Sequence, residues 1–84
     1  MQVSASGFSQ VSLAEKNVPL RSVFKKIQKQ TGFDFLYGSQ LLQEAGNVSI
    51  DVSNVSLENA LDLCFKGKPL AYTIIEKTIV VKPK

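Results

Sequence analysis

Hydrophobic residues recur at two different spacings along this chain, and the spacings alternate in the same order twice. In Val11–Glu15 and again in Val48–Val52, apolar and polar side chains alternate, which is the period of a half-buried β-strand. After each of these segments the apolar residues follow helical spacing and form one stripe along a helix face. The first stripe is Leu20, Val23, Phe24 and Ile27, and the second is Leu57, Ala60, Leu61, Cys64 and Phe65. The pattern therefore predicts a strand followed by an amphipathic helix, twice.

The two strand–helix segments are also similar in sequence, because Val48–Leu61 aligns with Val11–Phe24 at an offset of 37 residues. The identical residues stand at the aligned pairs Val11/Val48, Ser12/Ser49, Asn17/Asn54, Val18/Val55 and Leu20/Leu57. Several matches in one register indicate a duplicated unit. Each copy is expected to contain a short strand, a tight turn that includes the asparagine, an amphipathic helix and a further strand.

Proline, serine and glycine residues mark the ends of the predicted helices. Pro19 suits the first turn of the first helix, and Gly32 suits a left-handed cap at its end. Ser56 is a favourable N-cap for the second helix, which is expected to end at Gly67. Between the two units, the connecting segment Gly38–Asn47 is expected to contain a single helical turn.

Three further strands are predicted after the helices. The strand Phe33–Tyr37 places its three aromatic residues on one face, and Leu70–Ile75 and Thr78–Lys82 form a hairpin. Ile75 and Val80 stand outside the apolar alternation of that hairpin, so we expect them on the outer face of a sheet. Such a small open sheet could bind a partner by strand addition, or a neighbouring domain of the same polypeptide could cover it.

These elements predict an α+β fold, in which a duplicated β-α-β / β-α-β-β chain packs two helices between two small sheets. The 84 residues correspond to one domain, and the pattern leaves open which strands share a sheet. Residues 11–83 are assigned to this domain and residues 1–10 to a flexible leader. Within the leader, Val3, Ser4 and Ala5 have the small-residue spacing of a signal-peptidase site. The leader is therefore interpreted either as the end of an export signal or as a flexible polar segment.

Side chains suited to catalysis are scarce in this sequence. It contains no histidine, which removes the commonest general base and the commonest metal ligand. Cys64 is the only cysteine, and its place on the apolar stripe of the second helix predicts a buried, inert thiol. The carboxylates are dispersed, and no metal-ligand spacing, phosphate loop or dinucleotide fingerprint occurs. We therefore predict a protein without enzymatic activity, metal or organic cofactor.

The net charge of +3 comes mainly from the first helix. A basic cluster around Lys25 and Lys29 could contact phosphates, but there is no GxxG loop and the aromatic residues fit a core, so nucleic acid is not the expected partner. The repeat aligns Arg21 with Glu58 and Lys25 with Asp62. If the two helices lie side by side, these charges could pair across them. If they diverge, each charged face could orient a separate partner.

Four motifs in this order resemble the STN domain, the secretin and TonB N-terminal short domain. They are N-V-P-L at Asn17–Leu20, T-G-F-x-F-x-Y at Thr31–Tyr37, N-V-S-L-E-x-A-L at Asn54–Leu61, and K-G-K-P-L-A-Y at Lys66–Tyr72. The resemblance covers about residues 11–83. It is strongest to the version that precedes TonB-dependent outer-membrane transporters of the starch-utilisation and ferric-citrate types.

This resemblance implies a monomeric periplasmic domain that is exported through a signal peptide and is not itself inserted in the membrane. A plug and a transmembrane β-barrel would follow it in the same polypeptide. The domain would dock on the periplasmic part of an anti-sigma regulator and so report uptake of a glycan or an iron chelate to transcription. Secretins carry a related domain as a ring-forming module, which is the alternative. The expected contact residues are Arg21, Lys25, Lys29, Phe33, Asp34, Phe35 and Tyr37.

Overall fold

The computed structural model describes residues 10–84. The predicted leader lies outside these residues except for Gln10, which is the first residue of the first strand. In chain order the elements are β1 (Gln10–Pro19), α1 (Leu20–Thr31), β2 (Asp34–Leu36), α2 (Ser39–Ala45), β3 (Asn47–Ser56), α3 (Leu57–Phe65), β4 (Leu70–Ile75) and β5 (Thr78–Pro83).

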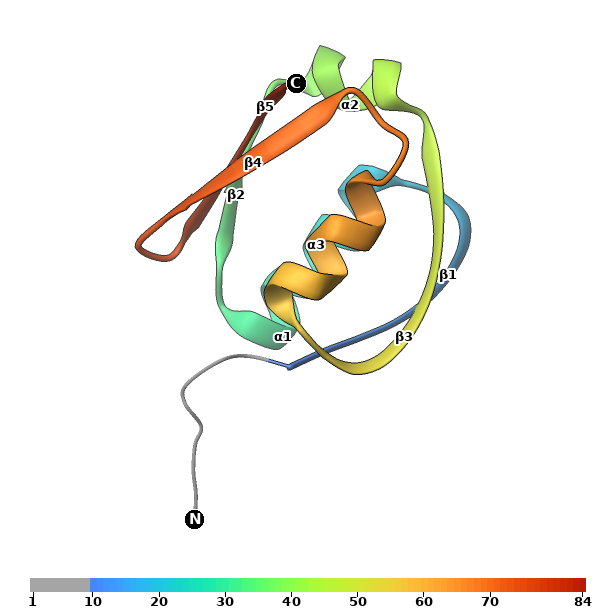
Figure 1. The fold of residues 1–84 in the computed structure, drawn as a ribbon, viewed down its shortest axis with the longest axis vertical. Coiled ribbons are helices and arrows are strands. Elements are labelled where there is room, and N and C mark those ends of the chain that lie inside the picture. The colour runs from blue at the N-terminus through green and yellow to red at the C-terminus, as the bar shows by residue number, and fades with distance from the viewer. Residues whose placement is uncertain (1–9) are drawn as a thin grey trace.

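Two small sheets enclose α1 and α3 (Figure 1). One sheet consists of β1 and β3, which run antiparallel. The other has the strand order β2-β5-β4, with β2 parallel to β5 and β4 antiparallel to it. This arrangement confirms the predicted α+β fold with two helices between two sheets.

The β1–β3 pair shows an internal two-fold relation that follows from the sequence repeat. Val11 pairs with Val55, and the equivalent residues Val48 and Val18 pair with each other. At the centre, Ala14 pairs with Asp51, its own counterpart in the other copy. The two copies of the repeat therefore complete each other's sheet, which a single strand–helix unit could not do.

The identical serine and asparagine residues join the two copies. The Ser49 hydroxyl accepts a hydrogen bond from the Asn17 N–H at 2.8 Å, and the Ser12 hydroxyl accepts one from the Asn54 N–H at 3.0 Å. Both asparagines have positive φ angles, 55° and 53°, which asparagine tolerates better than most residues. The prediction of a tight turn at these asparagines is wrong, because β1 and β3 continue through them and shift register nearby. The irregularity at each asparagine is local, because strand pairing resumes on both sides of it.

Loss of either serine hydroxyl is expected to destabilise the fold. Ser12→Ala and Ser49→Ala should each lower the free energy of unfolding by about 1 kcal/mol, because each leaves a bent backbone N–H without its partner. Urea unfolding followed by circular dichroism measures this loss. Ser53→Ala, on the exposed side of β3, is the matched control and should change stability by less than about 0.5 kcal/mol. Equal effects of Ser49→Ala and Ser53→Ala would contradict the assignment.

The predicted caps at Gly32 and Ser56 are present, whereas Pro19 is the N-cap of α1 and not part of its first turn, and α3 ends at Phe65 and not at Gly67. Gly32 has a φ of 79° and its N–H donates to the Gln28 carbonyl, as expected for a left-handed cap. The Ser56 hydroxyl accepts a hydrogen bond from the Asn59 N–H at 3.1 Å and caps α3. The connecting segment differs in extent, because α2 has seven residues where a single turn was predicted. Leu42 on α2 is buried and packs with the core, which stabilises the longer helix.

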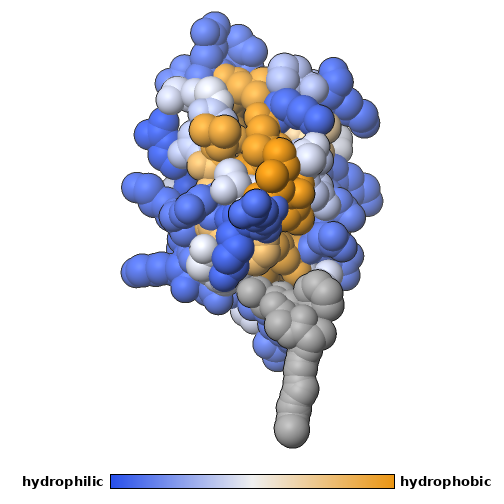
Figure 2. Space-filling view, turned by 90° about the vertical axis from the view of Figure 1, so that its left-hand side faces the viewer, coloured by the Kyte–Doolittle hydropathy of each residue, from blue (hydrophilic) through white to orange (hydrophobic). Residues whose placement is uncertain are grey.

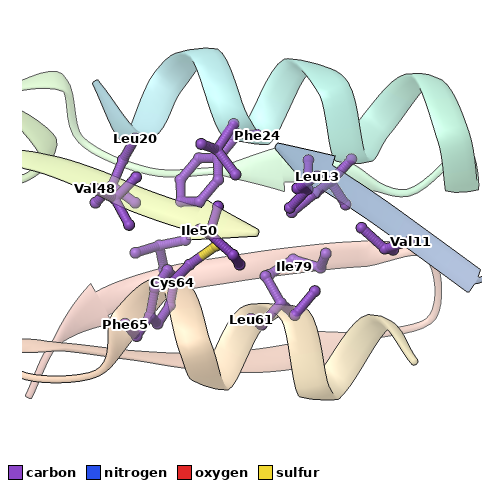
Figure 3. Packing of buried hydrophobic residues seen from close by; sticks show 14 of the residues in the cluster. Val11, Leu13, Leu20, Phe24, Val48, Ile50, Leu61, Cys64, Phe65 and Ile79 are labelled. Atoms are coloured by element: carbon purple, nitrogen blue, oxygen red, sulfur yellow. The ribbon is translucent and has the colours of Figure 1, made fainter. Parts of the chain in front are cut away.

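Both predicted apolar stripes are buried in one continuous core. In Figure 3, α1 and α3 run antiparallel, and Phe24 of the first helix and Leu61, Cys64 and Phe65 of the second point into the space between them. The Phe24 ring stacks on Phe35 of β2, with centroids 4.2 Å apart and planes 10° from parallel. The three-stranded sheet therefore closes the core on the side opposite β1 and β3.

Candidate functional site

A row of cations lies on the outer side of α1. Arg21, Lys25 and Lys29 are all exposed and follow each other at intervals of four residues, on the face opposite the buried stripe. Lys26, beside them in the sequence, instead pairs with Glu15 of β1. The helix amphipathicity that buries one stripe therefore also places these three cations in solvent, where they can contact a partner.

This row continues onto the edge of the three-stranded sheet. The Gln28 side-chain amide donates to the Asp34 carboxylate at 2.8 Å and so connects α1 with β2. β2 is an outer strand of its sheet, because the strand order is β2-β5-β4. The basic row and an edge strand thus form one continuous candidate surface.

The opposite charges on α3 do not pair with this row. Across residues 10–84 the structure contains one ion pair, between Lys26 and Glu15. Asp62 instead accepts a hydrogen bond from the Tyr72 hydroxyl at 2.9 Å. Burial and this hydrogen bond raise the pKa of Tyr72 to about 12. The two helices pack against one core, yet their opposite charges form no ion pair, so α1 keeps a basic face and α3 an acidic face.

The aromatic residues predicted as contacts lie mostly beneath the surface. Phe33, Phe35 and Tyr37 are half-buried against the core, and Phe35 is held there by its stack on Phe24. The Lys77 ammonium lies 5.4 Å from the centre of the Phe33 ring. These aromatic rings support β2 from the inside, while Asp34 between them is exposed.

Figure 2 shows an apolar stripe on the outer face of the three-stranded sheet, flanked by hydrophilic side chains. Leu36 and Ile75 are 60% and 57% exposed, and Val80 lies between the two edge strands, paired with Leu36. The outward orientation expected for Ile75 is confirmed, and half-buried Val80 alternates with buried Ile79 and Val81. Leu36 was missed by the sequence reasoning, although its place between inward-facing aromatic residues could have identified it.

Cys64 was predicted to be a buried, inert thiol, and the structure shows its environment. Its side chain is fully buried among the core residues, and burial raises the pKa of the thiol to about 11, with a smaller opposing effect from Lys68. In the range from residue 10 to residue 84, no group of three or more metal-ligating side chains comes together. In the same range, no helix is long and apolar enough to span a membrane.

Native Cys64 is expected to react with iodoacetamide at pH 8 at least about 100-fold more slowly than the unfolded chain. The raised pKa alone lowers the thiolate fraction by about that factor, and burial blocks access further. Mass spectrometry after timed quenching, with and without guanidinium chloride, measures both rates. Because the folded state holds this thiol neutral, the contribution of Cys64 to stability should be constant below about pH 9 and decline as the pH rises toward about 11. Rapid labelling of the folded protein would contradict the assignment.

Comparisons with known proteins give a match to a family and similarity in fold to solved structures. The family described as "Secretin and TonB N terminus short domain" matches residues 33–84. The fold is similar to that of a longer protein from Parabacteroides distasonis described as a candidate anti-sigma factor, with a TM-score of 0.75 and 19% sequence identity. That similarity covers 89% of this chain and 35% of the other protein, and at this identity it shows a shared fold. A comparison with curated protein sequences finds no match.

Proposed function

Because this chain belongs to the secretin and TonB N-terminus short domain family, we propose that it is a periplasmic interaction domain of a TonB-dependent outer-membrane receptor. In this role it docks on the periplasmic part of an anti-sigma regulator and reports the uptake of a substrate. The family match carries this proposal. The plug and barrel of the receptor would follow in the same polypeptide, and the residues before β1 would be the end of the export signal.

The surface proposed for docking is the basic row of α1 together with β2. Arg21, Lys25 and Lys29 supply exposed positive charge, and none of them forms an ion pair within residues 10–84. Asp34 and the backbone edge of β2 supply hydrogen-bonding groups beside the row. An acidic surface on the regulator would complement this face and orient the encounter. Phe33, Phe35 and Tyr37 act here by holding β2 in place from below.

Direct binding between the two purified partners tests the proposal. The probe is the periplasmic part of the anti-sigma regulator encoded beside the receptor gene, titrated into this domain in a calorimeter. We expect a one-to-one complex whose affinity falls as salt rises, because charged surfaces steer the association. A regulator that does not bind at low salt would refute the docking role.

The family description also includes secretins, so a ring-forming module is the second candidate. A secretin module would associate with further copies of itself, whereas a receptor domain is expected to remain a monomer. Analytical ultracentrifugation over a wide concentration range separates the two functions. Concentration-dependent growth to large oligomers would favour the secretin module and refute the receptor assignment.

A further inference from the structure

The outer edges of β1 and β3, the equivalent strands of the two copies of the repeat, differ in their contacts. On β1, the side-chain amide of Gln30 makes two hydrogen bonds with the backbone of Ser12, accepting from its N–H and donating to its carbonyl, both at 2.9 Å. Lys26 and Glu15 form an ion pair across the same helix–strand boundary. The outer edge of β1 is therefore already bonded by α1, as a neighbouring strand would bond it.

The equivalent edge of β3 lacks these contacts because the repeat differs at the residues that make them. At the offset of 37 residues, Gly67 replaces Gln30, Leu63 replaces Lys26 and Val52 replaces Glu15. Glycine and these aliphatic side chains can neither bond a strand backbone nor form an ion pair. Gly67 and Leu63 are exposed and Val52 is half-buried.

A shallow groove follows the outer edge of β3. Its lining includes the β3 backbone, Leu63, the cations Lys66 and Lys68 and the anion Asp51, so positive charge is in excess by one. The Lys68 ammonium donates to the Asn47 carbonyl at 2.8 Å. This bond occupies the first residue of β3, so the open part of the edge along the groove begins after Asn47. Because the backbone of a strand repeats every two residues, the N–H and C=O groups of Ser49 and Asp51 point to the same edge. In residues 10–84 the backbone of Ser49 receives no bond like the one Gln30 gives to Ser12.

We propose that this edge of β3, from Ser49 to Asp51, binds an extended segment of a partner polypeptide in which apolar and acidic residues alternate. The segment would add a third strand to the β1–β3 sheet through backbone hydrogen bonds. Leu63, which is 43% exposed, would receive an apolar side chain. Lys66 at the groove would pair with an acidic one.

Charge favours a different partner over a second copy of this chain. Two β3 edges paired with each other would bring Lys66, Lys68 and Asp51 of both copies to one small interface, where four lysines outnumber two carboxylates and like charges repel. An acidic strand avoids this repulsion. The site lies on the α3 side of the molecule, apart from the basic row of α1, so it does not depend on the docking role proposed above.

A tethered strand tests the site without knowledge of the natural partner. Lys84 lies beside Lys66 and Gly67, close to the groove, so a test strand of sequence TVEVEVT can be fused after Lys84 through a flexible glycine–serine linker. A short tether raises the effective concentration to about the millimolar range, which makes weak pairing measurable. Amide hydrogen exchange by NMR reads out each backbone N–H separately.

We expect the fused strand to slow exchange at Ser49 and Asp51 by about tenfold or more. A fusion with proline at the centre of the test strand cannot pair and should leave both amides unchanged. Lys66→Glu should reverse the charge preference, so that TVKVKVT protects better than TVEVEVT. Unchanged exchange at Ser49 and Asp51, protection at β2 or β4 instead, or concentration-dependent dimers would each overturn the proposal.

A matched variant on β1 tests the reasoning about the repeat. Gln30→Ala removes the side-chain amide that bonds the Ser12 backbone, so exchange at Ser12 should become about tenfold faster. Exchange at Ser49 in the same variant should not change. If Ser12 and Ser49 already exchange equally fast in the unaltered protein, the two edges are equally open and the inference is wrong.

Discussion

Phe24→Ala is expected to lower the free energy of unfolding by about 3–5 kcal/mol, the range found when a buried phenylalanine is truncated. Phe24 is 2% exposed and belongs to the buried core cluster. Its ring stacks on Phe35 and lies 5.7 Å from Tyr37 and 6.0 Å from Phe65, centroid to centroid. Truncation therefore removes aromatic contacts with β2 and α3 at the same time and leaves a cavity at the centre.

For a domain of this size, that loss is a large share of the whole stability. Urea unfolding followed by circular dichroism should show the midpoint fall steeply, or no folded baseline at all. Phe24→Leu keeps most of the volume and should lose less than Phe24→Ala, so it shows whether the cavity or the aromatic stack dominates. Lys25→Ala, exposed on the same helix, is the surface control and should stay within about 0.5 kcal/mol of the unaltered protein. Equal losses at Phe24 and Lys25 would contradict this account of the core.

Reversing two charges on α1 is expected to give the second large effect. Arg21→Glu with Lys25→Glu should weaken binding of the anti-sigma regulator by about 10- to 100-fold, or about 1.4–2.8 kcal/mol. The fold should remain intact, because neither side chain forms an ion pair with α3 or any other element within residues 10–84. Calorimetry with the regulator and urea unfolding of the double variant measure the two quantities.

Glu58→Lys is the matched control for this reversal, since Glu58 occupies the position of Arg21 in the other copy of the repeat. It lies on the acidic face of α3 and should leave binding of the regulator unchanged. A stability loss above about 2 kcal/mol in the α1 double variant would mean that its cations pair within the fold, against the structure. Unchanged binding in the double variant would place the contact on another face.

The sequence predicted those parts of the fold that depend on local periodicity. Leu20, Phe24 and Ile27 repeat at helical spacing, and all are buried on α1 as expected. The caps at Gly32 and Ser56 also followed from residue type, because left-handed backbone and N-terminal hydrogen bonding are local requirements. The exposed cations of α1 followed for the same reason, as the opposite face of the predicted helix.

Sequence reasoning failed where the outcome depended on residues far apart in the chain. The asparagines at positions 17 and 54 suggested turns, but each is held at a bulge by a serine hydroxyl from the other copy, more than thirty residues away. The parallel pairing of β2 with β5 was likewise not predicted. The capped edge of β1 depends on Gln30, whose position on a solvent-facing helix surface gave no sign that it bonds Ser12.

The sequence by itself thus determined the family, the duplicated unit, the helices and the residues that form the core, because each follows from spacing and residue type along the chain. The tertiary structure alone decided which strands pair, which charged side chains form ion pairs and which sheet edges remain open. The physical reason is that hydrogen bonds between strands use backbone groups common to all residues, so strand partners carry little sequence signal. In this protein, the sequence difference between Gln30 and its aligned residue Gly67 can be interpreted only because the structure shows Gln30 bonded to the edge of β1.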